Sequence, residues 1–365
     1  MIEKFSRIRN EKALAKTRYW KVDVSVNPET PAIQEAASLI RDGRLIAFPT
    51  ETVYGLGANA CDDAAVRAIF QAKGRPSDNP LIVHIAHLDQ LKELVHPLTA
   101  AAETLMERFW PGPLTVVLPL IDGAVSPIVS AGLNTLAVRM PAHPAALSLI
   151  EAAGVPIAAP SANLSGRPSP TSAMHVLEDL DGKISGIIDG GDASLGIEST
   201  VVLMREHQLE VLRPGGISIE ELAAALSEDV VLQYEHKTGA GKEAPRSPGM
   251  KYTHYAPKGE LVIVQGQPDK VQSWIQAQMK LDQQHARRTG ILAFHSPPTA
   301  YSEADHVIHI GRNMKYAAAR LYAALREFDQ KKIDMIYSEA CPEEGLGYAV
   351  MNRLRKASGN KSVLV

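Results

Sequence analysis

Two cationic side chains lie close together in the segment AKGRPSDNPL (72–81). Lys73 falls in the last turn of a predicted helix, where the helix dipole favours a cation, so its position has an ordinary structural explanation. Arg75 has no such explanation, because it lies between Gly74 and Pro76 in a turn. A rigid turn that presents Lys and Arg together suits the phosphate groups of a polyphosphate. This segment alone leaves both interpretations open.

Further polar side chains gather at the ends of predicted strands. FPTETVYGLG (48–57) combines hydroxyls, a carboxylate and two glycines, which a strand interior would not favour. Its glycines would let a ligand approach the backbone closely, although the segment could also be a simple turn. APSANLSG (159–166), IEST (197–200) and VLRPGG (211–216) repeat the pattern of a hydroxyl, an amide or an Arg at a strand end. Ligands of open α/β sheets collect at such ends.

Two of these segments offer specific ligands. In the predicted strand TLAVRM (135–140), alternation places Thr135, Ala137 and Arg139 on one face. Arg139 could form a salt bridge at a sheet edge or bind an anion. Ser161 and Asn163 could cap a turn, or they could bind phosphate oxygens or water around Mg²⁺.

Other familiar signatures are incomplete in this sequence. GLGANA (55–60) matches the loose dinucleotide-binding pattern, but no acidic residue ends a second strand about 20 positions later. TGAGKE (238–243) lacks the first Gly and the last Ser or Thr of a phosphate-binding loop, and no G-x-S-x-G elbow occurs. The histidine pairs of HIAH (84–87) and HVIH (306–309) would point to opposite faces of a strand, so we do not expect them to chelate a metal.

Helical and strand-like patterns alternate along the chain, which favours an α/β architecture that can position such groups. Asp62 and Gly74 are a typical start and stop for a helix between them. Helices are predicted at 31–43, 62–74, 99–109, 144–153, 172–180, 218–227, 268–281 and 313–328. Strands are predicted at 44–49, 81–85, 114–118, 135–140, 156–160, 186–190, 199–204, 208–212, 260–266, 290–295, 306–311 and 332–340.

The pattern breaks once, in a stretch rich in Gly, Pro and basic residues, which is typical of a linker. We therefore predict an N-terminal extension (1–30), a first α/β domain (31–232), a linker (233–258) and a small Rossmann-like α/β domain (259–365). A chain of 365 residues is long enough for two domains.

Composition excludes several classes of protein. The chain has 38 Lys and Arg against 41 Asp and Glu, a formal net charge of −3, which argues against a strongly basic nucleic-acid-binding protein. The only cysteines, Cys61 and Cys341, cannot build a disulfide framework or a zinc ribbon. No apolar run of about 18 residues occurs, and the N-terminus lacks the apolar core of a signal peptide. We expect a cytoplasmic protein that does not enter a membrane.

Taken together, the polar segments resemble the YrdC-type threonylcarbamoyl-AMP synthases. Their signature K-x-R and S-x-N quartet would be Lys73, Arg75, Ser161 and Asn163. The resemblance covers 31–217, and SPGMKYTHYAP (247–257) with the final ~105 residues looks like the long, two-domain form of the family. The matching segments, in order, are FPTETVYGLG, KGRPSDNPL, PGPLTVVL, LAVRMP, APSANLSG and GIESTVV.

The resemblance implies a fold and an activity. The fold is a twisted open mixed sheet with a concave, positive face, followed by a small Rossmann-like domain. The activity joins L-threonine, bicarbonate or CO₂, and ATP into threonylcarbamoyl-AMP, with release of pyrophosphate. Mg²⁺ would enter with ATP and take no protein side chain as ligand. The product would serve threonylcarbamoyladenosine formation beside the tRNA anticodon, through a separate transferase complex and without stable nucleic-acid binding by this chain.

The resemblance also implies roles for individual residues, with the linker 233–258 as a lid over the nucleotide to which Tyr252, His254 or Tyr255 would contribute. Lys73 and Arg75 would be catalytic. L-Threonine would contact Thr52, His84, Arg139, Ala159 and Ser199. ATP would contact Lys73, Arg75, Asn79, Thr135, Ser161, Asn163, Ser169, Arg213 and Tyr252.

Two other functions fit parts of this pattern. A concave basic face would suit double-stranded RNA, but the net charge and the lack of a basic stripe interleaved with aromatic residues disfavour it. A carbamoyl-adenylate-forming domain of the hydrogenase-maturation type would use carbamoyl phosphate. Such proteins carry additional acylphosphatase and zinc-finger segments, for which this chain has neither the cysteines nor the room.

Overall fold

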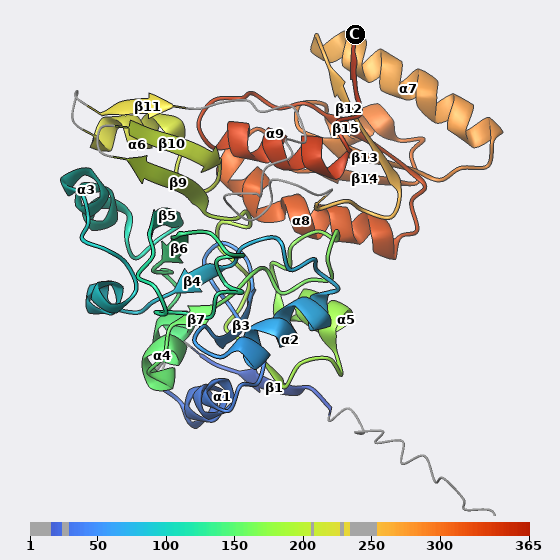
Figure 1. Cartoon of the computed structure of the whole chain (residues 1–365). Helices are drawn as coiled ribbons and strands as arrows, with labels where there is room; N and C mark the ends of the chain where they lie inside the picture. The colour runs from blue at the N-terminus through green and yellow to red at the C-terminus, as the bar shows by residue number, and fades with distance from the viewer. Residues whose placement is uncertain (1–15, 24–28, 206–207, 227–229, 234–253) are drawn as a thin grey trace, which may run out of the picture.

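The computed structural model describes residues 16–23, 29–205, 208–226, 230–233 and 254–365, and these form two β-sheets covered by helices (Figure 1). The larger sheet has the strand order β1-β8-β2-β3-β7-β4-β6-β5-β9-β10-β11 and mixes parallel with antiparallel pairs, as predicted. Its strands are β1 (Arg18–Lys21), β2 (Ile46–Phe48), β3 (Gly55–Asn59), β4 (Ile82–His84), β5 (Leu114–Pro119), β6 (Thr135–Arg139), β7 (Ile157–Ala158), β8 (Gly186–Asp189), β9 (Thr200–Arg205), β10 (Gln208–Arg213) and β11 (Val231–Gln233).

Local sequence signals fix the helices of this half of the chain. Asp62 accepts hydrogen bonds from the Ala64 and Ala65 amides at the start of α2, and Gly74 ends the helix with a left-handed φ of 61°. The predicted helix 62–74 is therefore confirmed. The helices are α1 (Pro31–Arg41), α2 (Asp63–Lys73), α3 (Ala100–Phe109), α4 (Pro144–Ala153), α5 (Ala173–Leu180) and α6 (Ile219–Ala225), with a short 3₁₀ helix at Leu88–Glu93.

The two faces of the large sheet bury separate apolar clusters. Ile33 of α1 and Leu149 of α4 pack with Phe48 on one face, and Val66 of α2 and Leu105 of α3 pack on the other. Strand alternation produces this division, because neighbouring residues of one strand point to opposite faces. β1 adds an edge strand from within the predicted extension 1–30, paired in parallel with β8.

The second sheet is entirely parallel, in the order β14-β13-β15-β12-β16, as a Rossmann-like arrangement requires. Its long helix α7 packs on one face, while α8 and α9 pack on the other and face the first half of the chain (Figure 1). The sequence analysis missed α9 and β16. The strands are β12 (Glu260–Gln265), β13 (Thr289–Ala293), β14 (His306–His309), β15 (Met335–Glu339) and β16 (Ser362–Leu364); the helices are α7 (Pro268–Gln284), α8 (Met314–Gln330) and α9 (Leu346–Ala357), with a 3₁₀ turn at Pro298–Tyr301.

The two halves of the chain share one apolar cluster. Val53 and Ile197 of the first half and Tyr255 pack with residues of α8 and α9, so the halves contact each other through a buried surface. In the part of the chain that the structure describes, no helix is both long and apolar enough to span a bilayer.

Candidate active site

One cavity collects most of the predicted site residues at the ends of β4 and β6. His84 and Arg139 end these two parallel strands and are direct partners in the strand register. Parallel strands bring their carboxyl ends to the same edge of a sheet, and this places the two side chains together. The predicted residues that line the cavity are Thr52, Lys73, Arg75, His84, Arg139, Ala159, Ser161, Asn163, Ser199 and Arg213.

Arg139 is held with its guanidinium in the cavity wall. Its Nε donates to the carbonyl of Gly112 at 3.2 Å, and its Nη1 donates to Oγ1 of Thr52 at 2.8 Å. Nη2 lies 2.7 Å from a carboxylate oxygen of Glu51. The side chain is only 5% exposed, so the charge is both oriented and desolvated. An Arg fixed in this way can bind a carboxylate through two parallel hydrogen bonds.

His84 also lines this cavity. The imidazole is buried, and its Nδ1 has no hydrogen-bond partner among the described residues. Burial, together with the positive charge of Arg139, lowers the pKa of His84 to about 3. The ring is therefore neutral at physiological pH and can offer either a donor or an acceptor to a bound ligand.

Lys73 lies in the last turn of α2, as predicted, and its side chain is buried. The side chain is only 3% exposed. Its Nζ donates to the carbonyl of Ser161, and to the carbonyl and Oδ1 of Asn163 at 2.6 and 3.3 Å. Burial and the neighbouring charge of Arg75 hold the pKa of Lys73 well below its usual value. Lys73 thus joins the end of α2 to the loop 159–166 and lies at the cavity wall.

The loop 159–166 has its own internal order. The Ser161 hydroxyl donates to Oδ1 of Asn163 at 2.5 Å, and Nδ2 of Asn163 donates to the carbonyls of Leu164 and Arg167 at 2.9 and 2.8 Å. Asn163 is therefore a structural anchor of the loop as well as a cavity residue. The Arg75 guanidinium lies nearby, half-buried, and donates weakly to the carbonyls of Asn79 and Pro80.

Arg213 and Ser199, which also line the cavity, form a buried pair. Nη2 of Arg213 donates to the carbonyl and hydroxyl of Ser199 at 3.0 and 3.1 Å. The Ser199 hydroxyl also lies 2.7 Å from Oγ1 of Thr115. The end of β10 is thereby tied to the segment that precedes β9.

Three of the predicted site residues that the structure describes do not line this cavity. Asn79 is fully buried beside it, and both atoms of its side-chain amide lack a hydrogen-bond partner among the described residues. Thr135 starts β6, at the end opposite Arg139. Ser169 does not line the cavity, but its hydroxyl donates to a carboxylate oxygen of Glu198, which does, at 2.7 Å. Tyr252 falls outside the described residues.

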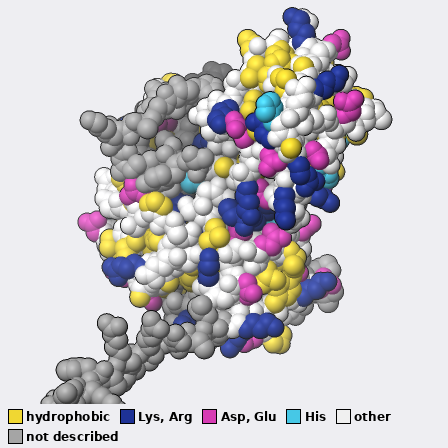
Figure 2. Space-filling model, turned by 90° about the vertical axis from the view of Figure 1, so that its right-hand side faces the viewer, with side chains coloured by type: hydrophobic (Ala, Val, Ile, Leu, Met, Phe, Trp, Pro, Cys, Tyr) yellow, Lys and Arg dark blue, Asp and Glu magenta, His cyan; other side chains and the backbone are white. Residues whose placement is uncertain are grey.

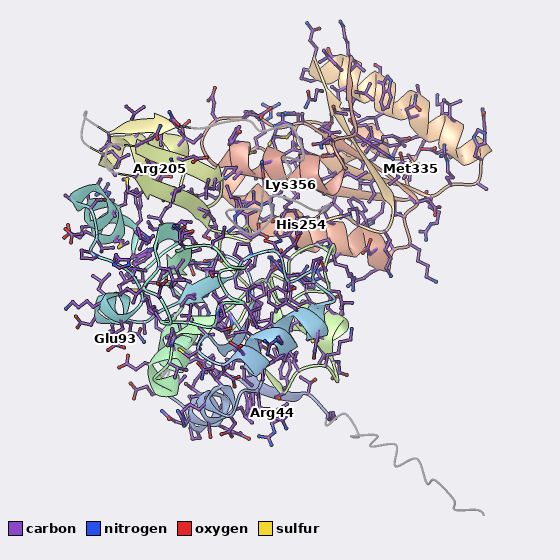
Figure 3. All side chains as sticks on the ribbon, viewed as in Figure 1. Arg44, Glu93, Arg205, His254, Met335 and Lys356 are labelled. Atoms are coloured by element: carbon purple, nitrogen blue, oxygen red, sulfur yellow. The ribbon has the colours of Figure 1, made fainter. Side chains whose placement is uncertain are left out.

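The sequence analysis noted the Glu51 carboxylate without giving it a role, and it did not single out Glu198. Glu51 is partly buried beside Arg139, and Glu198 is buried beside Arg353. His254 and Tyr255, which were expected to cover the nucleotide, do line the cavity. His254 lies where the two halves of the chain meet (Figure 3). Burial and the charge of Arg75 lower its pKa to about 3. Among the described residues, no group of three or more His, Cys, Asp or Glu is placed to hold a metal ion.

Comparison with known proteins identifies the family. A family model described as "Telomere recombination" matches residues 38–215, and one described as "Threonylcarbamoyl-AMP synthase, C-terminal domain" matches 217–359. The threonylcarbamoyl-AMP synthase of Bacillus subtilis is 51% identical over 95% of this chain and 99% of its own length. That of Pyrococcus abyssi is 48% identical over 94% of this chain and 99% of its own. The chain belongs to the threonylcarbamoyl-AMP synthase family.

A solved structure agrees over nearly the whole chain. The complex of P. abyssi Sua5 with L-threonine superimposes with a TM-score of 0.88 at 46% identity, and covers 96% of this chain and 100% of the solved chain. The predicted family, the predicted two-part α/β fold and the predicted threonylcarbamoyl-AMP synthase activity are therefore confirmed. The individual residue roles stay predictions.

The neutral histidines of this site predict a loss of stability in acid. His84 and His254 have pKa values of about 3 in the folded protein. The unfolded chain binds their protons below about pH 6.5, so it takes up more protons than the folded protein as the pH falls toward 3. The free energy of unfolding should drop by up to about 1.4 kcal/mol per pH unit for each such histidine.

Urea denaturation at pH 7, 6 and 5 measures this slope. His84→Asn should make the slope shallower, because asparagine does not titrate in this range. An exposed histidine, His285, provides the control, and His285→Asn should leave the slope unchanged. A stability that is constant between pH 7 and 5 would contradict the assignment of two buried neutral imidazoles.

Proposed function

We propose that this cavity binds L-threonine, bicarbonate or CO₂, and ATP, and joins them into threonylcarbamoyl-AMP with release of pyrophosphate. The observation that carries the proposal is the division of one cavity between two kinds of group. Among the lining residues, Arg139 contacts Thr52 and is the strand partner of His84, and this group suits an amino acid; Lys73 donates to Ser161 and Asn163, and these residues with Arg75 suit phosphates. The L-threonine complex of the P. abyssi relative supports the first half of this division.

The chemistry has two steps. The unprotonated amine of L-threonine adds to CO₂ and loses a proton, which gives the carbamate. A carbamate oxygen then attacks the α-phosphorus of ATP, a new P–O bond forms, and the bond to the β-phosphate oxygen breaks to release pyrophosphate. Phosphoryl transfer of this kind depends mainly on positioning and on charge neutralisation. The residues that the cavity supplies are suited to both tasks, and none of them needs to become a covalent nucleophile.

Each group has a proposed task. Arg139 binds the threonine carboxylate, with Thr52 and Ser199 beside it. Arg75 neutralises phosphate charge as pyrophosphate forms. The negative charge of bound ATP raises the pKa of Lys73, so its protonated Nζ supplies a second positive charge. Ser161, Asn163 and Arg213 face the nucleotide, with Asn79, Thr135, Ser169 and Tyr252 as further proposed contacts. Ala159 closes the wall beside the amino acid.

The remaining requirements concern the reactants and the product. Mg²⁺ enters as the metal complex of ATP, since phosphate oxygens supply the hard ligands that Mg²⁺ favours. The product is a mixed anhydride that water destroys, so a separate transferase must consume it, and we propose the complex that modifies tRNA. We expect all of this to occur in the cytoplasm.

The two alternative functions receive less support from the structure. Figure 2 shows acidic side chains interspersed among Lys and Arg over the described residues of the face it displays, rather than a basic stripe suited to double-stranded RNA. A carbamoyl-adenylate-forming enzyme would have no use for an Arg placed to bind an amino-acid carboxylate. Pyrophosphate release that requires L-threonine, bicarbonate and ATP together would establish the proposal. Release without L-threonine, or only with carbamoyl phosphate, would refute it.

Arg139→Lys tests the amino-acid half of the cavity. Lysine keeps the charge but loses the planar fork, so the carboxylate loses one of two charged hydrogen bonds. At about 1.5–3 kcal/mol per such bond, the KM for L-threonine should rise about 10–100-fold while the KM for ATP stays constant. Lysine at the exposed Arg41 is the matched control. If only the KM for ATP rises, Arg139 binds the nucleotide rather than L-threonine, and its assignment to the amino acid is wrong.

A further inference from the structure

The segment 195–199 of the first half of the chain lies directly against helix α8. Gly196 has a φ of 77°, and a Cβ atom there would lie 2.4 Å from Cα of Ala319 and 2.6 Å from the carbonyl oxygen of Ala318. Only glycine permits this approach. Ile197 is buried in the apolar cluster formed by α8 and α9. The contact leads into Glu198 and Ser199, which both line the catalytic cavity.

Glu198 connects the two halves through a set of short hydrogen bonds. Its Oε2 accepts from Nε of Arg353 on α9 at 2.7 Å and from the hydroxyl of Tyr322 on α8 at 2.8 Å. Its Oε1 accepts from the hydroxyl of Ser169 at 2.7 Å. Glu198 therefore receives hydrogen bonds from both halves of the chain within the wall of the cavity.

Arg353 is the main partner of this carboxylate. It is completely buried, and its Nη1 donates to Oδ1 of Asn352 at 2.9 Å. Its guanidinium carbon lies 5.6 Å from the centre of the Tyr255 ring, which itself packs against Tyr322 at 5.2 Å. Tyr255 also lines the cavity. Arg353 thus contacts two residues of the cavity wall without lining it.

The local charge keeps Glu198 ionised. Burial would raise its pKa, but the positive charges of Arg353 and Arg213 and the hydrogen bonds outweigh that effect and lower the pKa to about 2. On the same helix as Arg353, burial and the charges of Arg353 and Arg213 lower the pKa of Lys356 to about 7. A permanently ionised carboxylate is a poor general acid or base, so its task is to hold its partners in place.

We infer that Glu198 is a positioning residue for the reaction and that the C-terminal half of the chain completes the active site by holding it, through Arg353 and Tyr322. The carboxylate fixes Ser169 on the nucleotide side, and its own backbone fixes Ser199 on the amino-acid side. This inference rests on the proposed function. It gives the second half of the chain a defined part in catalysis, namely to orient the wall of a cavity that belongs to the first half.

Glu198→Gln and Arg353→Met test the inference in the full-length protein. If the glutamine keeps its carbonyl oxygen on Arg353 and Tyr322, its NH₂ group faces the Ser169 hydroxyl, which then has no acceptor there, and the charge that pairs with Arg353 is lost. Displacements near 1 Å can cost about 10²-fold in rate. We expect kcat/KM for pyrophosphate release to fall about 10²-fold in each variant, with a rise of about tenfold in the KM for ATP, because Ser169 loses its charged acceptor. The KM for L-threonine should change by about twofold at most.

A double variant separates positioning from independent effects. If Arg353 acts through Glu198, Glu198→Gln combined with Arg353→Met should lose no more activity than either single variant. Tyr322→Phe removes the hydroxyl that donates to both carboxylate oxygens of Glu198, at 3.0 and 2.8 Å, and keeps the ion pair, so it should fold and show a loss of about 3–10-fold in the same direction. The Tyr322→Phe variant therefore still tests the inference if Glu198→Gln and Arg353→Met do not fold.

The matched control is Glu339→Gln. Glu339 is a buried carboxylate in the second sheet that accepts hydrogen bonds from the Phe294, His295 and Ser296 amides at 2.7, 2.6 and 3.2 Å. Its loss should lower the melting temperature and leave both KM values unchanged. If the Glu198 and Arg353 variants behave like this control, or if their losses multiply, the inference is wrong. Wild-type protein that releases no pyrophosphate would overturn the proposed function along with it.

Discussion

Replacing Arg75 with Ala is expected to reduce ATP-dependent pyrophosphate release about 10²–10³-fold, equivalent to about 3–4 kcal/mol of transition-state stabilisation. Arg75 follows the left-handed Gly74 and is half-buried at the cavity, where it donates long hydrogen bonds to the carbonyls of Asn79 and Pro80. It has no part in the apolar core, so the free energy of unfolding should change little. Steady-state assays and urea denaturation of the same preparation measure both quantities.

Lys73→Met should reduce turnover to a similar extent but should also destabilise the protein. The buried Nζ donates to two carbonyls and to the side chain of Asn163, and methionine would leave these acceptors unsatisfied. Each buried polar group that loses its partner costs about 1–3 kcal/mol. Methionine is nearly the same size as lysine, so a change in packing volume does not contribute.

Two controls distinguish charge from geometry in this pair. Arg75→Lys keeps the charge and loses the fork, so it should retain more activity than the alanine variant. Lys92→Met changes an exposed lysine on the 3₁₀ helix and should leave turnover unchanged. Near-normal turnover in folded Arg75→Ala or Lys73→Met protein would contradict the assignment of these residues to the phosphates.

The sequence predicts the local features of this fold well, because capping residues and apolar periodicity report on neighbours along the chain. Asp62, Gly74 and the run LTVVL (114–118) each define an element without help from distant residues. Helix α9 escaped prediction because Gly345 precedes it without a side-chain cap, and β16 is a three-residue edge strand. Both depend on packing against elements that are distant in the sequence.

The residues of the active site are also predictable only where the signal is local in the sequence. Cationic and hydroxyl residues at strand ends could be found from the sequence, because topology places strand ends together. The burial of Lys73 could not, since its acceptors lie 88 and 90 positions away. Glu198 and Arg353 are separated by 155 positions, and each looks like an ordinary surface residue in its own segment. A buried ion pair between two halves of a chain therefore leaves no local signal in the sequence of either half.

Strong discrimination between L-threonine and L-valine is the second large effect that we expect. The two amino acids have nearly the same shape, and L-valine carries a methyl group in place of the hydroxyl. His84 is the strand partner of Arg139, and its buried Nδ1 has no hydrogen-bond partner among the described residues, so we expect this nitrogen to pair with the hydroxyl. A site that hydrogen-bonds a substrate hydroxyl is left with an unpaired buried polar group when the hydroxyl is missing, and kcat/KM can then fall about 10⁴-fold.

L-Serine separates the hydroxyl from the methyl group. It keeps the hydroxyl and loses one methyl, which is worth about 0.8 kcal/mol and so about a fourfold loss. The expected order of kcat/KM is therefore L-threonine, then L-serine, and L-valine far below both. Steady-state pyrophosphate release with each amino acid, at saturating ATP and bicarbonate, measures the ratios. Equal kcat/KM values for L-valine and L-threonine would show that the site does not recognise the hydroxyl. The amino-acid half of the cavity would then select its substrate by shape alone, and discrimination by shape rarely exceeds about 10²-fold in kcat/KM.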